Sequence, residues 1–189
     1  MAATVSRLSG GRAVVGVGLG SDESGDFSRF GEESDLRVRA SMLAEAVDIM
    51  RCLWAGTPCA PAGEHYAVDV PAAPAEPHPI PVWMASSTRS APVVARAAAC
   101  DGIFPISDHT LRPEEVAAIV AAVHDAGLRP DRPYDVAVSG NASPAWGHPN
   151  PDGVDLTAMA EAGATWWMES LGDWDPLELS MQVVDAGPP

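Results

Sequence analysis

The sequence predicts an α/β fold built from parallel βαβ units. Short apolar runs alternate with segments of helical periodicity along the chain, and this alternation is typical of parallel strands joined by helices. The first run, residues 12–19, is almost continuously apolar, as expected for a strand that is covered on both faces. We expect about five strands, whereas a complete (β/α)₈ barrel usually needs about 250 residues. A barrel built from these 189 residues would therefore lack roughly three units.

The expected elements alternate between strand and helix. The helix over residues 35–55 has the strongest signal, because its apolar positions recur at helical spacing, Ser34 or Asp35 can cap it, and Gly56 stands where a helix commonly ends. Strands are expected over residues 12–19, 80–85, 102–106, 134–139 and 164–171. Further helices are expected over residues 86–99, 113–127 and 156–162. Residues 57–81 are expected to form a proline-rich hairpin or loop insertion.

The composition is that of a globular, acidic protein. Hydrophobic residues make up 47% of the chain and charged residues 20%, which excludes the disordered and collagen-like classes. The net charge of −15 argues against nucleic acid and anionic membrane surfaces as partners. No run approaches the roughly 18–20 apolar residues of a membrane span, and residues 1–8 lack the apolar region of a signal peptide. We therefore expect a cytoplasmic protein.

No group of residues identifies a metal site or a catalytic acid or base. The histidines and cysteines lack the spacings that bind metal ions; they are His65, His78, His109, His124, His148, Cys52, Cys59 and Cys100. The three thiols are expected to be free. The acidic residues form no pair of the kind that glycosidases use. The sequence therefore predicts no metal and names no catalytic residue.

The glycine-rich segment that begins at Gly16 does not match the dinucleotide-binding fingerprint. That fingerprint, G-x-G-x-x-G, requires a glycine where the chain has Ser21 or Glu23. It also requires a helix directly afterwards, and a polar loop follows instead. A Rossmann-type site is not expected.

Ser86, Ser87 and Thr88 form the first candidate ligand site. They stand between an expected strand and an expected helix, where hydroxyl groups and free backbone amides can bind an anion. An ordinary helix cap is the alternative interpretation.

Trp166, Trp167 and Glu169 form the second candidate site, in the last expected strand. Because side chains alternate along a strand, one tryptophan is expected to face the interior of a barrel and the other the helices. Core packing is as good an interpretation of these tryptophans as a role in a pocket.

Several short motifs occur along the chain in a specific order. Residues 8–20 read LSGGRAVVGVGLG, residues 26–31 read DFSRFG and residues 53–56 read LWAG. GEHY at 63–66, PHPIPVWMA at 77–85 and AGATWWMESL at 162–171 follow them. This ordered set resembles the bacterial luciferase-like monooxygenase family over essentially the whole chain.

The resemblance implies a TIM-type (β/α)₈ barrel of luciferase-like type, truncated to about its last five βα units. In this frame the expected strands are the fourth to the eighth, and residues 1–189 form a single partial barrel domain. The absent strands would leave apolar inner faces and strand edges uncovered. We therefore expect that the chain by itself is not a stable catalytic monomer, and a homo-oligomer is one way to cover these surfaces.

The resemblance also implies an oxidoreductase that binds FMN or the deazaflavin coenzyme F-420. With FMN and molecular oxygen such an enzyme oxidises a small organic substrate, and with the deazaflavin it transfers hydride. Gly18 and Gly20 would allow the flavin ring to approach closely. Ser86, Ser87 and Thr88 match the turn that binds the flavin phosphate in relatives.

The resemblance places Trp166 and Glu169 at the mouth of the substrate pocket. Leu19 stands where bacterial luciferase has an arginine that grips the phosphate, so that contact is not expected here. The alternative function is that of a non-catalytic fragment, or of a flavin-binding remnant that lacks the early barrel strands.

Overall fold

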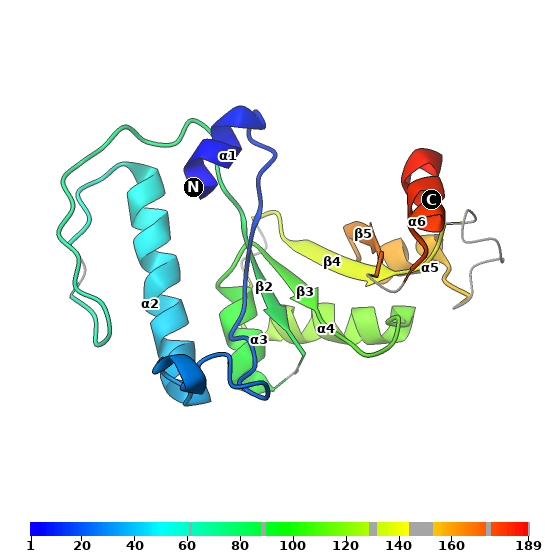
Figure 1. Cartoon of the computed structure of the whole chain (residues 1–189), viewed down its shortest axis with the longest axis horizontal. Helices are drawn as coiled ribbons and strands as arrows, with labels where there is room; N and C mark the ends of the chain where they lie inside the picture. The colour runs from blue at the N-terminus through cyan, green and yellow to red at the C-terminus, as the bar shows by residue number, and fades with distance from the viewer. Residues whose placement is uncertain (61, 88–89, 129–131, 144–152, 173–174, 189) are drawn as a thin grey trace. The chain divides into compact units, whose positions relative to one another are not determined.

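The computed structural model describes residues 1–60, 62–87, 90–128, 132–143, 153–172 and 175–188. The chain forms two compact units, Met1–Met84 and Ala85–Pro189, with their boundary inside the second strand. The expected alternation of strands and helices is confirmed in the described residues (Figure 1).

The first unit contains two parallel strands and a long helix. It begins with α1 (Ala2–Leu8) and β1 (Val15–Val17). A short 3-10 helix, η1 (Ser28–Phe30), precedes α2 (Leu36–Ala55), and β2 (Val82–Ser86) starts at the end of the unit. Val15 of β1 lies opposite Val82 of β2, and Val17 lies opposite Met84.

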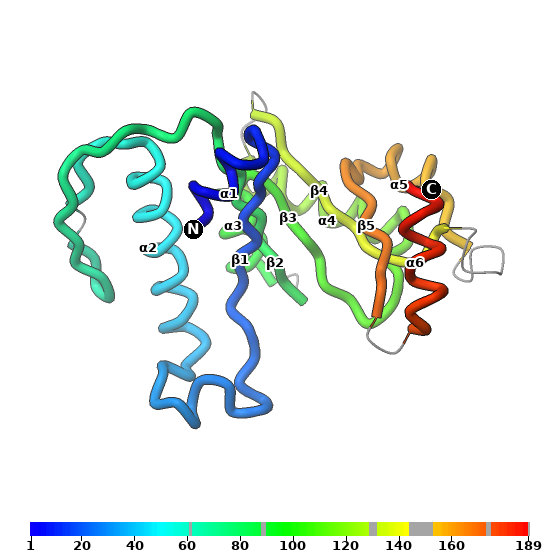
Figure 2. The backbone as a smooth tube through the Cα atoms, turned by 45° about the horizontal axis from the view of Figure 1, so that its top comes forward, coloured from blue at the N-terminus to red at the C-terminus, as the bar shows by residue number. Residues whose placement is uncertain are grey.

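After the end of β2, the described residues of the second unit form four helices and three strands. The helices are α3 (Ala91–Ala98), α4 (Pro113–Asp125), α5 (Leu156–Glu161) and α6 (Leu177–Ala186). The strands are β3 (Gly102–Pro105), β4 (Asp135–Gly140) and β5 (Trp166–Glu169). β4 is parallel to both β3 and β5. Figures 1 and 2 both place α6 beside α5 and β5.

The strands belong to one sheet in the order β1-β2-β3-β4-β5. Each strand therefore lies next to the one that precedes it in the sequence, with a helix in each connection. This is the order of a (β/α)₈ barrel, whereas a doubly wound sheet reverses its order at a switch point. The predicted α/β class with parallel strands is confirmed.

β4 has the burial expected of a parallel strand covered on both faces. Val136, Ala137 and Val138 follow one another in the chain and are all buried, so that side chains on both faces are covered. β1 differs from this expectation, because none of its three residues is buried. The reason is its position as the first strand of the sheet order, next to β2 alone.

α2 has the boundaries that its sequence predicted. Oδ1 of Asp35 accepts hydrogen bonds from the backbone N–H groups of Arg37 (2.8 Å) and Val38 (3.1 Å), which otherwise have no partner in the first turn. Gly56 ends the helix in the left-handed conformation, with φ +71°. Both ends are therefore determined by residues next to the helix.

α3 begins later than expected. The sequence predicted a helix from residue 86, but Ser86 is the last residue of β2, and Ser90 is the capping residue of a helix that starts at Ala91. Pro92 explains this start, since a proline without an N–H group is tolerated in the first turn and not further inside a helix. Ser86 and Ser87 therefore precede the helix and do not form its first turn.

Two helices, α1 and α6, were not expected from the sequence. Leu177, Met181 and Val184 of α6 do have helical spacing, but all three are exposed, and Val183 is the buried residue of this helix. None of the described helices has the length and apolar character that crossing a membrane requires.

The buried position of Val183 gives a matched test of how α6 is held. Val183 is 4% exposed and Val184 58% exposed. We expect Val183→Ala to lower the free energy of unfolding by roughly 1.5–3 kcal/mol, because it removes buried methyl groups. Val184→Ala should change it by less than about 0.5 kcal/mol. Urea denaturation measures both values, and equal losses would mean that α6 is not docked through Val183.

Candidate functional site

A pocket of about 320 Å³ lies beyond the carboxyl end of β1, within the first unit. Its lining residues come from the segment after β1, the loop before α2, α2 itself and the hairpin that follows; they are Gly18, Leu19, Gly20, Phe27, Glu32, Glu33, Arg39, Met42, Leu43, Ala46 and Tyr66. Ligands of parallel α/β sheets bind at the carboxyl ends of strands. Gly18 and Gly20, two residues expected to bind a cofactor, therefore line the pocket together.

Gly20 is needed for close packing at this pocket. Its φ of +65° favours glycine, and a Cβ atom would lie 3.2 Å from both Nη2 of Arg39 and Cζ of Phe27. The sequence suggested that this glycine allows a flavin ring to approach. In the structure it leaves room for the paired side chains of Arg39 and Phe27.

Arg39 is a pocket-lining residue that the sequence reasoning missed. The side chain is 9% exposed and lines the pocket, with its Cζ atom 3.5 Å from the centroid of the Phe27 ring. This is the geometry of a cation–π contact. A signal was present, since Arg39, Leu43 and Ala46 are spaced i, i+4 and i+7 and share the inner face of α2.

Asp22 holds Phe27 beneath Arg39. Its Oδ1 atom accepts hydrogen bonds from the backbone N–H groups of Phe27 (2.8 Å) and Ser28 (3.1 Å). These two N–H groups, first that of Phe27, lower the pKa of Asp22, and the positive charge of Arg39 lowers it further. The ionised carboxylate therefore fixes the turn that carries Phe27.

Glu45 connects α2 to the hairpin and so places Tyr66 at the pocket. Antiparallel bridges join Cys59 to Val70 and Ala62 to Ala67, so a hairpin is present within residues 57–81. The Glu45 carboxylate accepts hydrogen bonds from the backbone N–H groups at the hairpin tip: Oε1 from Glu64 (2.9 Å), and Oε2 from His65 and Tyr66 (3.0 Å each). Partial burial by itself would raise the pKa of Glu45, but these N–H groups outweigh burial and lower it.

We expect Glu45→Gln to loosen the hairpin tip, because a neutral amide oxygen accepts these hydrogen bonds more weakly than a carboxylate does. Amide hydrogen exchange of residues 64–66 should become faster than in the unaltered protein. Asp48→Asn is the control, since it removes a charge from an exposed position of the same helix. Unchanged protection in Glu45→Gln would contradict the proposed anchor.

The pH dependence of the same contact has a definite sign. Because the pKa of Glu45 is lowered in the folded protein, its contribution to stability is complete above the unfolded value of about 4.3 and is lost as the pH falls through the folded value. The amide resonances of residues 64–66 should therefore hold their positions until the pH is below about 4.3.

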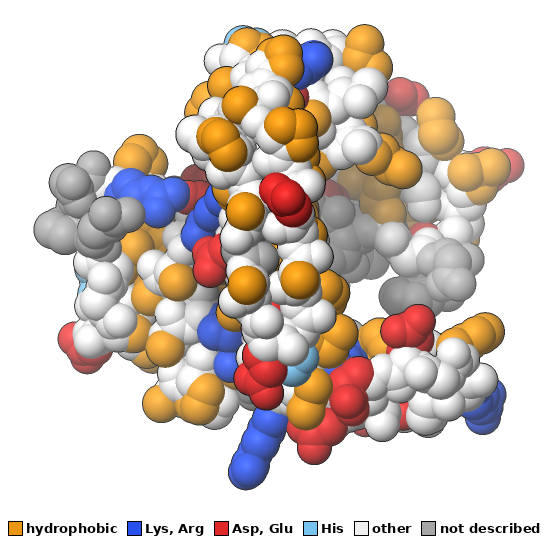
Figure 3. All heavy atoms as spheres, turned by 90° about the vertical axis from the view of Figure 1, so that its left-hand side faces the viewer, with side chains coloured by type: hydrophobic (Ala, Val, Ile, Leu, Met, Phe, Trp, Pro, Cys, Tyr) orange, Lys and Arg blue, Asp and Glu red, His pale blue; other side chains and the backbone are white. Residues whose placement is uncertain are grey.

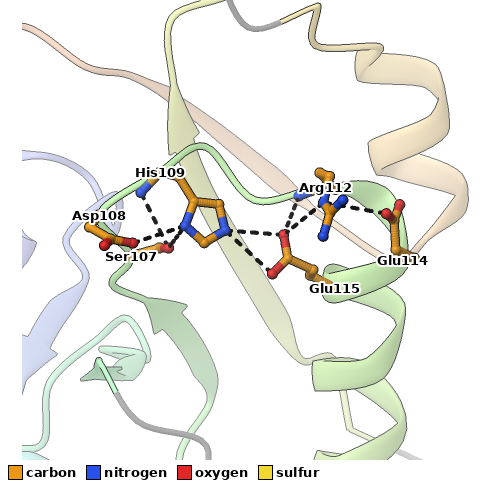
Figure 4. A network of polar contacts seen from close by, with 6 residues as sticks. All are labelled: Ser107, Asp108, His109, Arg112, Glu114 and Glu115. Atoms are coloured by element: carbon orange, nitrogen blue, oxygen red, sulfur yellow. Dashed lines mark hydrogen bonds and ion pairs between the residues drawn. The ribbon is translucent and has the colours of Figure 1, made fainter.

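A second polar cluster lies in the second unit, after β3 and at the start of α4 (Figure 4). Nδ1 of His109 lies 3.0 Å from Oγ of Ser107 and 2.9 Å from Oδ1 of Asp108, and Nε2 lies 3.3 Å from Oε2 of Glu115. The contact with Asp108, followed by that with Glu115, raises the pKa of His109. The backbone N–H of Arg112 is the main cause that lowers the pKa of Glu115 to about 2.

Carboxylates beside both ring nitrogens stabilise the charged imidazolium of His109 relative to the neutral ring. These contacts tie the β3–α4 connection to the first turn of α4.

Nuclear magnetic resonance titration of His109 tests this cluster. We expect an imidazole pKa above about 6.5 that falls toward this value in Glu115→Gln, because the variant loses one flanking charge. Glu114→Gln is the matched control, since Glu114 contacts Arg112 and forms no hydrogen bond or ion pair with His109 in the described residues. The ion-pair contribution is complete below the unfolded pKa and is lost as the pH rises through the folded pKa. Equal effects of the two variants would contradict the assignment.

Trp166 and Glu169 lie at opposite ends of β5. Trp166 is the first residue of the strand and is 51% exposed, and its Nε1 donates to Oδ1 of Asp135, the first residue of β4 (3.0 Å). Glu169 is the last residue of β5. The two residues that the sequence placed at one pocket mouth are therefore not brought together, because three steps along a strand separate them by about 10 Å.

Trp167 is the tryptophan that contacts Glu169. Its Nε1 donates to Oε2 of Glu169 (2.9 Å), while Oε1 accepts from the backbone N–H groups of Ala142 (2.8 Å) and Ser143 (2.9 Å). A Cβ atom on Gly140 would lie 2.7 Å from the Trp167 ring, so glycine allows the ring to lie there. Trp167 is half-buried, and neither tryptophan is in the core.

The Ser86–Ser87–Thr88 candidate is only partly described. The backbone oxygen of Ser86 accepts a hydrogen bond from the N–H of Ile106 (2.9 Å), and Ser87 is exposed. Thr88 lies outside the described residues. In the part of the chain that the structure describes, no group of three or more histidine, cysteine or carboxylate side chains could hold a metal ion.

Comparison with known proteins identifies the class. The pattern of the luciferase-like monooxygenases matches residues 1–164, so the chain belongs to this family. The resemblance of the sequence motifs is confirmed. No curated protein sequence matches the chain.

Among solved structures, an F420-dependent secondary alcohol dehydrogenase in complex with an F420-acetone adduct has the same fold, with a TM-score of 0.57 and 17% sequence identity. The similarity covers 98% of this chain and 64% of the dehydrogenase chain. The fold is therefore that of a luciferase-like barrel, of which the described residues form five parallel strands.

The first-unit pocket has two features that suit a flavin cofactor, a cation and an apolar wall. An anionic group needs a cation or N–H donors, and Arg39 presents a guanidinium on the pocket wall. A planar ring needs an apolar surface, and Leu19, Met42 and Leu43 provide one.

Proposed function

We propose that the protein is an oxidoreductase that uses FMN or the deazaflavin coenzyme F-420 to act on a small organic substrate. Membership of the luciferase-like family supports this proposal. The observation that carries it is the pocket beyond β1, in which glycines, an apolar wall and a buried arginine occur together. When bound, such a cofactor supplies hydride transfer or, as FMN, oxidation with molecular oxygen.

The residues of the chain would bind and orient the cofactor and keep water away. Gly18 and Gly20 leave space next to the strand end, and Leu19, Met42 and Leu43 present apolar surface. We further propose that Ser86, Ser87 and Thr88 hold the phosphate through hydroxyl and backbone donors.

For the substrate pocket we propose Glu169 with Trp167 as its neighbour. Glu169 stands at the carboxyl end of β5, which is the end at which barrel enzymes bind their substrates. Trp166 stands at the other end of the strand. We propose hydride transfer as the reaction to test first, since the similar structure is a deazaflavin-dependent alcohol dehydrogenase.

Cofactor titration followed by a turnover assay tests the proposed function. We expect FMN or F-420 fluorescence to be quenched on adding the full chain. We also expect the bound, oxidised cofactor to be reduced by a secondary alcohol. Ser86→Ala/Ser87→Ala should weaken cofactor binding about a hundredfold or more, because hydrogen bonds to a charged group contribute about 1.5–3 kcal/mol each and the double variant removes two hydroxyl donors. Ser90→Ala is the control, since its side chain makes no capping hydrogen bond.

The outcomes separate the two functions that the sequence left open. Quenching together with reduction supports an oxidoreductase. Quenching favours the non-catalytic flavin-binding alternative if the bound cofactor is not reduced and no tested substrate is oxidised with oxygen. Absence of binding to both cofactors at high micromolar concentration would refute both.

A further inference from the structure

Arg39 is a buried cation whose guanidinium has no hydrogen-bond acceptor in the described part of the chain, although the charge of the nearby Asp22 carboxylate acts on it. Its side chain is 9% exposed, and within the described residues its guanidinium forms no hydrogen bond and no ion pair within 4 Å. A guanidinium has several N–H donors and keeps its charge at any ordinary pH. Burial of a charge without a partner is costly. The contacts of the described chain therefore leave the N–H donors of Arg39 without an acceptor.

The contact with Phe27 leaves the donors of Arg39 available. The aromatic ring covers one face of the planar guanidinium, with 3.5 Å between Cζ and the ring centroid. The N–H groups of a guanidinium lie in its plane, at the edge and not on the face. Stacking therefore orients the group without using its hydrogen-bonding capacity. The pocket adjoins the same side chain.

The nearby carboxylates are engaged elsewhere. Asp22 accepts the backbone N–H groups of Phe27 and Ser28, and Oε1 of Glu33 accepts the N–H of Asp35 (2.7 Å). Glu32 and Glu33 line the pocket but are exposed. Figure 3 shows the side on which α2 and the hairpin lie, where acidic side chains gather at the end at which α2 begins. The pocket thus has an acidic rim and a positive interior.

We propose that Arg39 anchors an oxyanion-binding site in this pocket and holds the phosphate or carboxylate group of an amphiphilic small molecule. The planar guanidinium suits a two-pronged contact with such a group. The apolar wall of Leu19, Met42, Leu43 and Ala46 suits the uncharged part of the same molecule.

Two sources could supply the oxyanion: the phosphate of the flavin cofactor, or an anionic group of the substrate. In the first case the inference rests on the proposed cofactor, and it assigns the phosphate to Arg39 in place of Ser86, Ser87 and Thr88. In the second case it stands independently of the cofactor. The experiment therefore uses inorganic phosphate, FMN and riboflavin as separate probes, since FMN and riboflavin differ in the phosphate alone.

The first measurement is made on the unaltered, full chain. The Nε–Hε resonance of Arg39 is followed by nuclear magnetic resonance while inorganic phosphate is added at low ionic strength. We expect a saturable shift of this resonance. A resonance that does not respond to inorganic phosphate or to FMN would overturn the proposal, whatever the behaviour of any variant.

The second measurement compares variants. Arg39→Met keeps a side chain of similar length over Phe27 and removes the charge, and Arg37→Met makes the same change at an exposed site of the same helix. We expect Arg39→Met to weaken phosphate or FMN binding by about tenfold or more and Arg37→Met by less than about twofold. Arg39→Lys, which keeps the charge without the planar fork, should fall between them.

The remaining outcomes either identify the source of the oxyanion or refute the proposed oxyanion site at Arg39. Loss of FMN affinity with unchanged riboflavin affinity in Arg39→Met assigns the oxyanion to the cofactor. If phosphate binding depends on Arg39 but does not compete with FMN, the oxyanion belongs to a ligand other than the cofactor. This outcome supports the Arg39 site even if the proposed function is refuted. Equal losses for FMN and riboflavin would mean that Arg39 is structural. If Arg39→Met does not fold, as judged by its thermal melt, Arg39→Lys and the resonance of the unaltered chain decide.

Discussion

The pocket of the first unit depends above all on the carboxylate of Glu45. This group accepts three consecutive backbone N–H groups from the hairpin tip, and a carboxylate is the acceptor that binds such groups most strongly. The contact brings Tyr66 to the pocket wall. Gly63 must lack a side chain, because a Cβ atom there would overlap the carboxylate of Glu45. In the described residues, these hydrogen bonds join the hairpin tip to α2.

Arg39, on the same helix, depends on contacts of a different kind. Gly20 leaves the room, Asp22 fixes the turn, and Phe27 covers one face of the guanidinium. These contacts orient the group but give its N–H donors no acceptor in the described residues. The N-terminal end of a helix also disfavours positive charge, so α2 itself gains nothing from the arginine. A buried charge that does not contribute to the stability of its helix is typical of a ligand-binding site.

A luciferase-like barrel supports more than one chemistry, because the fold supplies the strand ends and the side chains at those ends determine what binds. The polar cluster of Ser107, His109 and Glu115 illustrates the distinction. These residues stand after β3, where a catalytic role would be geometrically suitable, but their contacts stabilise the protonated imidazole. The identity of the residues at a strand end therefore does not assign a reaction until their hydrogen bonds are known.

The sequence by itself determined the elements whose signals are local. Asp35, Gly56 and the apolar spacing between them predicted α2, and the short apolar runs predicted parallel strands, because caps and periodicity act over a few neighbouring residues. Local signals also led to an error: they predicted a helix from Ser86, whereas Pro92 in the first turn sets the start of α3 at Ala91.

Only the tertiary structure decided which residues meet. Glu45 and Tyr66 are 21 positions apart and are joined by closure of the hairpin. The contact of Glu169 with Trp167, and not with Trp166, follows from the alternation of side chains along β5. Arg39 could be placed on the inner face of α2 from its spacing, but its lack of an acceptor depends on the surrounding chain. Hydrogen bonds and burial between distant segments are set by how the chain packs, and no local pattern of residues encodes them.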